Sequence, residues 1–339
     1  MQNKILTIVV PTYNTEKYLS RCLSSLLFDK ITNEKIEMIV VNDGSKDNSL
    51  EIARFYEAKY PNTVFVIDKE NGGHGSTINA GLKAASAKYF RVVDSDDWVN
   101  IDDFPDYVNA LEKEDADMII TDYSREEVAS GVSISSTFID LIESNVLYNV
   151  NSFDFSTLKD KRFGMANITY KTKILNDANL YLDEKMFYVD MEYIILPAPY
   201  IKTFKYLDFD IYRYFLGRAE QSVSAKSYVK NSAHHEKMMR RVIDFYSGLS
   251  DEEKIKKYIG KIISSLLETH YFVFCKWGET AEMRENIREF DSYLKSTAVD
   301  LYKKTNSGYI MANRKTDFVF VSRAGNVFSR LISKLSRGK

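Results

Sequence analysis

Three aspartates stand in the short stretch Asp94-Ser95-Asp96-Asp97, directly after the apolar residues 89–93. The apolar run predicts a buried strand, so these carboxylates are expected at its carboxyl end. Carboxylates so close together repel one another and are costly to desolvate. As oxygen ligands they suit a hard divalent cation, and a cation would suit a substrate that carries phosphates. The stretch therefore indicates nucleotide-dependent group transfer; the alternative is a polar turn, where aspartate is common.

Strand and helix patterns alternate through the first part of the chain. Strands are expected over residues 5–10, 38–41, 64–67, 89–93 and 118–121, and helices over residues 18–28, 50–60, 76–87 and 104–112. Short apolar strands separated by helices predict an α/β fold with a mostly parallel sheet covered by helices. Ligands bind beyond the carboxyl ends of such strands. The polar stretches at residues 12–14, 42–45 and 94–97 are expected at that edge.

The later part of the chain has a different pattern. Residues 204–207 and 211–215 suggest that the sheet continues, whereas helical spacing dominates after about residue 227. Between residues 255 and 274, apolar side chains recur every three or four positions over several turns. We therefore expect a first domain over residues 1–225 and a C-terminal helical domain over residues 226–339.

Composition and charge exclude some classes of protein. The net charge of -2 gives no electrostatic support for binding nucleic acid. Cys22 and Cys275 lack the spacing of a metal site, which favours a reduced, cytoplasmic protein. The sequence shows neither a signal peptide nor an apolar stretch long enough to span a bilayer.

The segment from Val327 to Lys339 is both apolar and basic. Its apolar residues can share one helical face, and arginines and lysines surround them. This pattern is typical of a helix that lies on an anionic membrane surface, so a peripheral membrane contact is one hypothesis. The alternative is a helix that packs on its own domain, because most amphipathic helices face a core.

Five motifs in the first hundred residues together resemble the family 2 glycosyltransferases. They are Pro11-Thr12-Tyr13-Asn14, Asn42-Asp43-Gly44-Ser45, Asn71-Gly72-Gly73, Asn79-Ala80-Gly81 and Asp94-Ser95-Asp96-Asp97-Trp98. The resemblance implies a GT-A fold, in which a nucleotide-binding α/β sheet merges with an acceptor-binding part. It also implies transfer of a sugar from a nucleotide donor, usually uridine diphosphate, with inversion at the anomeric carbon.

The same resemblance places the nucleotide near the first two motifs. Pro11, Thr12, Tyr13 and Asn14 would bind the nucleotide. Thr12 and Tyr13 would border the uracil, and Asp43 would accept a hydrogen bond from its imide N–H. An aromatic ring such as that of Tyr13 can cover the face of a base. The alternatives are that Tyr13 packs on the core and that Asp43 caps the following helix.

The loop at residues 71–76 would approach the phosphates. Glycines such as Gly73 allow close backbone approach, and the N-terminus of a helix favours phosphate. Ile78 stands where the family often has an arginine, which puts any donor contact of that arginine in doubt. His74 would compensate by reaching the nucleotide; the alternative is a polar surface residue.

For the aspartate stretch, the resemblance implies separate roles. Asp94 and Ser95 would contact the nucleotide, with Asp94 facing the ribose or the metal. Asp96 would be the main ligand of Mn²⁺ or Mg²⁺, which would neutralise charge on the departing diphosphate. Asp97 would bind the donor sugar or orient the loop.

A general base is expected in the second half of the family's catalytic region. The matching stretch, residues 187–195, makes Asp190 the expected base, with Glu192 in reserve. The alternative is that Asp190 caps the following helix. Arg213, Arg218 and Gln221 resemble a loop that closes over the diphosphate; the alternative is a surface loop with ordinary ion pairs.

The sequence thus predicts a metal-dependent inverting glycosyltransferase. It would move a sugar from a UDP-sugar to a glycan or lipid-linked glycan in surface polysaccharide synthesis, in the cytoplasm or at the inner face of the membrane. Two alternatives remain: a non-catalytic carbohydrate-binding protein and a sugar-nucleotide pyrophosphorylase. The pyrophosphorylase needs a loop rich in glycine and arginine after the first strand, and residues 11–16 contain neither.

Overall fold

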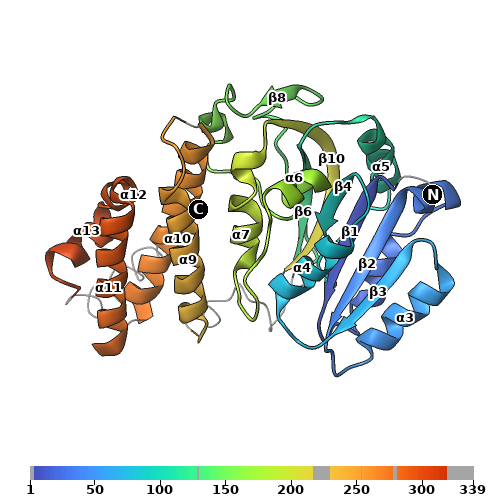
Figure 1. Cartoon of the computed structure of the whole chain (residues 1–339), viewed down its shortest axis with the longest axis horizontal. Coiled ribbons are helices and arrows are strands. Elements are labelled where there is room, and N and C mark those ends of the chain that lie inside the picture. Colours follow the sequence, from blue (N-terminus) through green and yellow to red (C-terminus); the bar gives the residue numbers. More distant parts are fainter. Residues whose placement is uncertain (1–3, 128–129, 217–229, 253, 278–280, 319–339) are drawn as a thin grey trace. The chain divides into compact units, whose positions relative to one another are not determined.

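The computed structural model describes residues 4–127, 130–216, 230–252, 254–277 and 281–318 (Figure 1). The chain divides into two compact units, Met1–Gln221 and Ser222–Lys339. The predicted domain boundary at residue 225 falls in residues 217–229, outside the described residues. The same holds for Arg218, Gln221 and the segment from Val327 to Lys339.

The first unit is built on one mixed sheet, whose main strand order is β3-β2-β1-β4-β9-β6-β10-β5. Its strands are β1 (Leu6–Thr12), β2 (Ile36–Asp43), β3 (Val64–Lys69), β4 (Tyr89–Val92), β5 (Trp98–Val99), β6 (Met118–Glu127), β7 (Ser133–Ser136), β8 (Leu147–Asn149), β9 (Ile168–Lys171) and β10 (Thr203–Leu216). Its helices are α1 (Leu19–Ser25), α2 (Lys30–Lys35), α3 (Ser49–Lys59), α4 (His74–Ala84), α5 (Phe104–Lys113), α6 (Thr172–Asp177) and α7 (Val189–Ile195), with short 3-10 turns η1 (Phe155–Leu158) and η2 (Ala198–Tyr200).

The first four strands form the parallel half that the sequence predicts. β1 pairs in parallel with β2 on one side and β4 on the other, and β2 pairs with β3. Leu6, Ile8 and Val10 of β1 lie in the core cluster that also holds the buried residues of α1 and α5. On the opposite face, Val9 meets α4 at Gly81, where an added Cβ would lie 2.4 Å from the valine side chain. The absence of a side chain at Gly81 therefore lets α4 lie close against the sheet.

The second half of the sheet is mixed rather than parallel. β9, which the sequence pattern does not predict, pairs antiparallel with both β4 and β6. The two apolar runs predicted at 204–207 and 211–215 form one strand, β10, with register shifts between Tyr206 and Tyr212. At its far end β10 pairs antiparallel with β5, directly after the aspartate stretch. The chain therefore brings β10 back to the turn that follows β4.

The second unit is helical, as the sequence predicts. It contains α9 (Ser232–Ser247), α10 (Lys254–Trp277), α11 (Ala281–Thr297), α12 (Val299–Lys304) and α13 (Gly308–Lys315). The periodic face of α10 is buried from Ile255 to Tyr271, including His270. Among the residues that the structure describes, no helix is both long enough and apolar enough to cross a membrane.

Candidate active site

The aspartate stretch forms a tight turn at the carboxyl end of β4. The N–H of Val93 donates to the carbonyl of Val9 at 3.0 Å, and the N–H of Asp97 donates to the carbonyl of Asp94 at 2.9 Å. The strand order reverses direction between β1 and β4, because the chain proceeds to β2 and β3 on one side of β1 and returns to β4 on the other. A turn at such a reversal is where parallel sheets place ligands.

Asp97 is directed into the protein, away from solvent. Its side chain accepts hydrogen bonds from the Tyr212 hydroxyl at 2.5 Å and from the N–H of Phe215 at 2.8 Å. Burial raises the pKa of Asp97 well above its ordinary value, and the charges of Asp96 and Asp94 raise it further. Of the two predicted roles, these contacts favour orienting the loop, because both carboxylate oxygens hold the turn against β10.

His74 and Asp94 form a pair across the site. His74 is the first residue of α4, and its Nε2 donates to Asp94 Oδ1 at 2.8 Å. Both side chains keep about a third of their surface exposed, at 32% and 29%. Burial acts to lower the pKa of His74, but the charge of Asp94 and the hydrogen bond to it outweigh burial and raise the pKa. His74 is therefore part of the acidic site and not an isolated surface residue.

Asp190 lies in the same electrostatic environment. Burial raises its pKa above the ordinary value of an aspartate, against the opposing charges of His74 and Arg162, while Asp94 raises it further. Tyr188, in a left-handed conformation with φ 68°, is the N-cap of α7, so Asp190 lies inside the first turn and is not the cap. Asp190 therefore lies close enough to His74 and Asp94 for their charges to act on its pKa, although more than 90 positions separate it from them in the sequence.

Glu192, the reserve base, occupies a different environment. It is fully buried, and its Oε2 accepts a hydrogen bond from the N–H of Asp183 at 2.8 Å. A carboxylate that is closed off from solvent and bound to the backbone does not suit deprotonation of an incoming hydroxyl. Its contact instead supports the loop that precedes α7.

Asp43 holds the glycine loop that follows β3. Its Oδ1 accepts from Lys69 Nζ and from the N–H of Gly72, each at 2.8 Å, and its Oδ2 accepts from the N–H of Gly73 at 2.8 Å. Asp43 does not cap α3, where Asp47 Oδ1 accepts from the N–H of Ser49. Its carboxylate therefore shapes the loop, a function that the motif alone did not indicate.

The residues after β1 border the same edge of the sheet. Pro11, Thr12 and Ser95 are buried, whereas Tyr13 is 50% exposed and is not a core residue. Asn14, at φ 53°, accepts from the N–H of Lys46 through Oδ1 at 2.7 Å. The loops after β1 and β2 are thus joined, with the Tyr13 ring on the outside.

The glycine loop packs directly against the segment that leads to Asp190. The carbonyl of Gly72 accepts from the N–H of Lys185 at 2.5 Å. A Cβ at Gly75 would lie 2.2 Å from the carbonyl oxygen of Asp183, and Gly73 has φ 84°. Asn79 completes the contact, because its side chain bonds both the N–H and the carbonyl of Leu182 at 2.9 Å. The glycines therefore serve close packing of two chain segments.

Sequence reasoning missed several residues around the site. Tyr212 bonds Asp97. Burial raises the pKa of Tyr214, and the charges of the aspartate stretch and of Asp190 raise it further. These tyrosines alternate along β10, and only their strand pattern was noted in the sequence. Arg21 donates to the carbonyl of Asp96 at 3.2 Å with its guanidinium 3.7 Å from the centre of the Trp98 ring. Arg213, expected either in a loop over the diphosphate or in an ordinary ion pair, bonds Asp210 at 2.5 Å.

The described residues of the site provide few oxygen ligands for a metal ion. Among the described residues, no group of three or more histidine, cysteine or acidic side chains has a metal-binding arrangement. Both carboxylate oxygens of Asp97 are bonded to Tyr212 and Phe215, so the carboxylates of this turn that could contribute an oxygen ligand are those of Asp94, which also bonds His74, and Asp96. Magnesium is commonly held by one or two carboxylates together with substrate phosphates. The residues therefore fit an ion whose coordination the substrate completes.

Known proteins share both sequence and fold with this chain. The sequence profile of glycosyl transferase family 2 matches residues 7–174. Glycosyltransferase GlyA of Streptococcus pneumoniae is 30% identical over 209 residues, which cover 56% of this chain and 29% of GlyA. The poly(ribitol-phosphate) beta-glucosyltransferase of Bacillus spizizenii is 30% identical over 202 residues, covering 56% of this chain and 31% of that protein. The chain thus matches less than a third of the length of either relative.

One solved structure extends the comparison over most of the chain. Staphylococcus aureus TarS 1–349, in complex with UDP-GlcNAc, has a TM-score of 0.63 and 20% identity, and the match covers 91% of this chain and 92% of that one. The fold is accordingly that of the GT-A type glycosyltransferases. Residues 7–174 therefore form a glycosyl transferase family 2 domain.

Proposed function

We propose that this chain is an inverting hexosyltransferase that moves a sugar from a UDP-sugar to a glycan or lipid-linked glycan acceptor. The observation that carries this proposal is the His74–Asp94 pair at the reversal point of the sheet, whose charges act on the pKa of Asp190. Relatives named as a glycosyltransferase and a poly(ribitol-phosphate) beta-glucosyltransferase support a place in surface polysaccharide synthesis.

The donor nucleotide would bind at the ends of β1 and β2. Tyr13, half exposed beside the buried Thr12, offers a ring to the uracil, and Asn14 fixes the loop that carries it. Asp43 holds the Gly72 and Gly73 amides, so it positions the loop that borders the nucleotide as well as facing the base. His74, at the N-terminus of α4, would lie beside the diphosphate, where helix termini favour anions.

Asp96 and Asp94 would hold the cation, Mn²⁺ or Mg²⁺, together with the diphosphate oxygens. A cation held there would supply positive charge beside the departing diphosphate. His74 orients the Asp94 carboxylate through its hydrogen bond, and Asp97 holds the turn in place from inside the protein.

Asp190 would act as the general base. Its carboxylate takes the proton of the acceptor hydroxyl while that oxygen bonds to the anomeric carbon. The bond from the anomeric carbon to the diphosphate oxygen breaks in the same displacement, so UDP leaves with the bonding electron pair. Burial, which raises the pKa of Asp190, makes its carboxylate a stronger base than an exposed aspartate.

The membrane part of the proposal rests on sequence alone. A basic amphipathic segment from Val327 to Lys339 would bring the enzyme to the cytoplasmic face of the membrane, where a lipid-linked acceptor lies. Deleting this segment should reduce binding to vesicles containing anionic phospholipid. Unchanged vesicle binding would refute the proposed membrane contact but would not affect the transferase proposal.

A calorimetric donor screen tests the central proposal. UDP and the UDP conjugates of glucose, galactose and N-acetylglucosamine are titrated into the full chain with and without Mn²⁺. We expect metal-dependent binding of UDP and a preference for one conjugate. Asp96→Ala should remove the metal-dependent part, and Asp102→Ala, an exposed aspartate beyond the turn, should not. Absence of uridine nucleotide binding in the unmodified chain, or equal effects of the two variants, would contradict the proposal.

A further inference from the structure

Tyr214 lies on β10 between two contacts that tie this strand to the aspartate turn. Two residues earlier, the Tyr212 hydroxyl donates to Asp97 at 2.5 Å and accepts from the N–H of Asp94 at 3.3 Å. Directly after Tyr214, the N–H of Phe215 donates to Asp97 Oδ1 at 2.8 Å. Because alternate residues of a strand point to the same face, the side chains of Tyr212 and Tyr214 share the face that meets the turn. The backbone at Tyr214 is therefore held beside the aspartate turn.

The Tyr214 side chain combines a packed ring with an unused hydroxyl. It is half-buried and packs against the core cluster that also contains Tyr212. Within the part of the chain that the structure describes, the Tyr214 hydroxyl takes part in no hydrogen bond. The hydroxyls of Tyr212 and Tyr89, by contrast, bond protein atoms. Since buried tyrosine hydroxyls usually bond a partner, the hydroxyl of Tyr214 is available to a ligand.

Carboxylates from two parts of the chain act on this hydroxyl. Burial raises the pKa of Tyr214, and four charges raise it further, those of Asp97, Asp94, Asp190 and Asp96. Tyr214 therefore lies close enough to the aspartate turn and to Asp190 for both to act on its pKa. With a raised pKa the hydroxyl stays protonated at neutral pH, so it can donate a hydrogen bond where ionised carboxylates only accept.

The proposed reaction puts the donor sugar between these two sets of carboxylates. The anomeric carbon is joined to the diphosphate, which would lie with the cation at Asp94 and Asp96. The acceptor oxygen that attacks the same carbon would give its proton to Asp190. The sugar ring would therefore lie between the turn and the base, and Tyr214 interacts with both.

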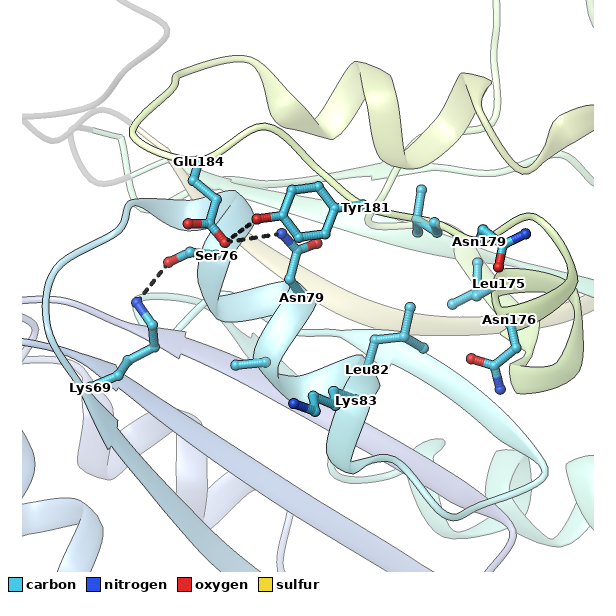
Figure 2. Close-up of a pocket in the computed structure, with 12 residues that line it drawn as sticks. Lys69, Ser76, Asn79, Leu82, Lys83, Leu175, Asn176, Asn179, Tyr181 and Glu184 are labelled. Atoms are coloured by element: carbon cyan, nitrogen blue, oxygen red, sulfur yellow. Dashed lines mark hydrogen bonds between the residues drawn. The ribbon is translucent and has the colours of Figure 1, made fainter.

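Donors on β3 and α4 are already bonded within the protein. Figure 2 shows Lys69 of β3 bonded to Ser76, and the side chain of Asn79 on α4 directed at Glu184. Lys69 also bonds Asp43 at 2.8 Å. The groove of about 460 Å³ that Lys69 and Asn79 line includes no residue of the 94–97 turn or of β10. These donors are thus not available to a sugar beside the aspartate turn, whereas the free hydroxyl on β10 is.

We propose that the Tyr214 hydroxyl binds the donor sugar, by donating a hydrogen bond to a hydroxyl or acetamido oxygen of the hexose that is transferred. This inference rests on the proposed transferase function and names a residue that selects among donors. A UDP-sugar whose oxygen at this position points elsewhere loses the bond and leaves Tyr214 without a partner. The nucleotide and the diphosphate make no bond with Tyr214, so the binding of UDP alone does not depend on it.

Comparison of UDP with UDP-sugars in Tyr214→Phe tests this assignment. UDP and the UDP conjugates of glucose, galactose and N-acetylglucosamine are titrated with Mn²⁺ into the unmodified full chain and into the variant, and binding is followed by calorimetry. We expect the variant to bind UDP as the unmodified chain does. It should bind the preferred conjugate about three- to tenfold more weakly, the effect of losing one neutral hydrogen bond. Thermal unfolding should be unchanged, because the ring stays and the hydroxyl has no partner among the described residues.

Tyr89→Phe is the matched control, because it removes a hydroxyl that donates to the carbonyl of Ala116 at 3.1 Å from the start of β4. It should lower the stability of the first unit and leave the ratio of UDP-sugar to UDP affinity unchanged. Equal weakening of UDP and the conjugate in Tyr214→Phe, or no weakening of either, would overturn the assignment while the transferase proposal stands. If the unmodified chain binds no uridine nucleotide, the transferase proposal fails and the assignment fails with it.

Discussion

Replacing Tyr212 by phenylalanine removes one hydroxyl from beneath the 94–97 turn. That hydroxyl donates to the Asp97 carboxylate at 2.5 Å and accepts from the N–H of Asp94 at 3.3 Å. Asp97 is only 1% exposed, so water does not replace the lost donor. A hydrogen bond to a charged group contributes about 1.5–3 kcal/mol, and the longer contact to Asp94 adds less. At a pH above the raised pKa of Asp97, where the carboxylate is charged, we therefore expect the free energy of unfolding of the first unit to fall by about 2–3 kcal/mol.

The cost of Tyr212→Phe should depend on pH. The pKa of Asp97 is raised, so this carboxyl favours the folded state when protonated, and that contribution is lost as the pH rises through the raised pKa. Removing the donor raises the pKa of Asp97 again, because the hydrogen bond from Tyr212 acts to lower it. The loss in free energy of unfolding caused by Tyr212→Phe should therefore become smaller as the pH falls and larger as the pH rises. The change is at most about 1.4 kcal/mol per pH unit.

The measurement is urea unfolding followed by the fluorescence of Trp98, which directly follows Asp97. The sequence has 2 tryptophans, so a Trp277→Phe background isolates this signal from the second unit. Tyr89→Phe is the matched control, because the Tyr89 hydroxyl is buried and donates at 3.1 Å to a neutral carbonyl oxygen. Its loss should cost about 1 kcal/mol. A Tyr212→Phe cost no larger than that of Tyr89→Phe, or one that does not vary with pH, would refute the reasoning.

Three further predictions concern the base, the glycine loop and the helical unit. Asp190→Asn should bind UDP normally but transfer sugar about 10²–10⁴-fold more slowly. The transfer rate of the unmodified enzyme should fall on acidification at a pH above the ordinary aspartate pKa. Unchanged transfer by Asp190→Asn would exclude Asp190 as the base. Gly75→Ala should destabilise the first unit, since its Cβ would lie 2.2 Å from a carbonyl oxygen, whereas Gly164→Ala, with 3.6 Å of room, should be tolerated in thermal unfolding. Burial lowers the pKa of His235 to about 4 and that of His270 well below its ordinary value. The two neutral histidines should thus contribute fully to the stability of the helical unit above the pKa of an unfolded histidine, and this contribution should be lost as the pH drops towards 4. We expect circular dichroism to show an acid transition that changes when both histidines are replaced by glutamine; the same transition in the double variant would contradict this.

The parallel half of the site follows from simple patterns in the sequence. Each polar stretch comes directly after an apolar strand, and the ends of parallel strands must meet at one edge. These patterns do not predict in which direction an individual side chain points. Asp97 and Asp96 are neighbours of the same type, and only the return of β10, with Tyr212 placed 115 residues away, buries Asp97. No local pattern encodes such a partner.

Asp43 is a second residue whose contacts the sequence pattern did not predict. Its motif indicates a ligand contact, but its oxygens bond the amides of a loop nearly 30 residues later. The antiparallel strand β9 was missed for a related reason, since residues 168–171 are short and lie in an irregular region. The C-terminal helical face was predicted well, because burial of Ile259, Ile263 and Leu267 depends on spacing within one helix.

The contacts between the glycine loop and the segment before α7 constrain how this protein can be recombined with its relatives. The Asn79 side chain hydrogen-bonds the backbone of Leu182, and Gly75 packs so close to Asp183 that a side chain at position 75 would not fit. Residues 71–84 and 179–192 therefore pack as one unit, although about a hundred residues separate them. A chimera that takes residues 71–84 from one parent and residues 179–192 from another would place a side chain of the wrong shape against this contact. Swaps that involve either segment should exchange both together.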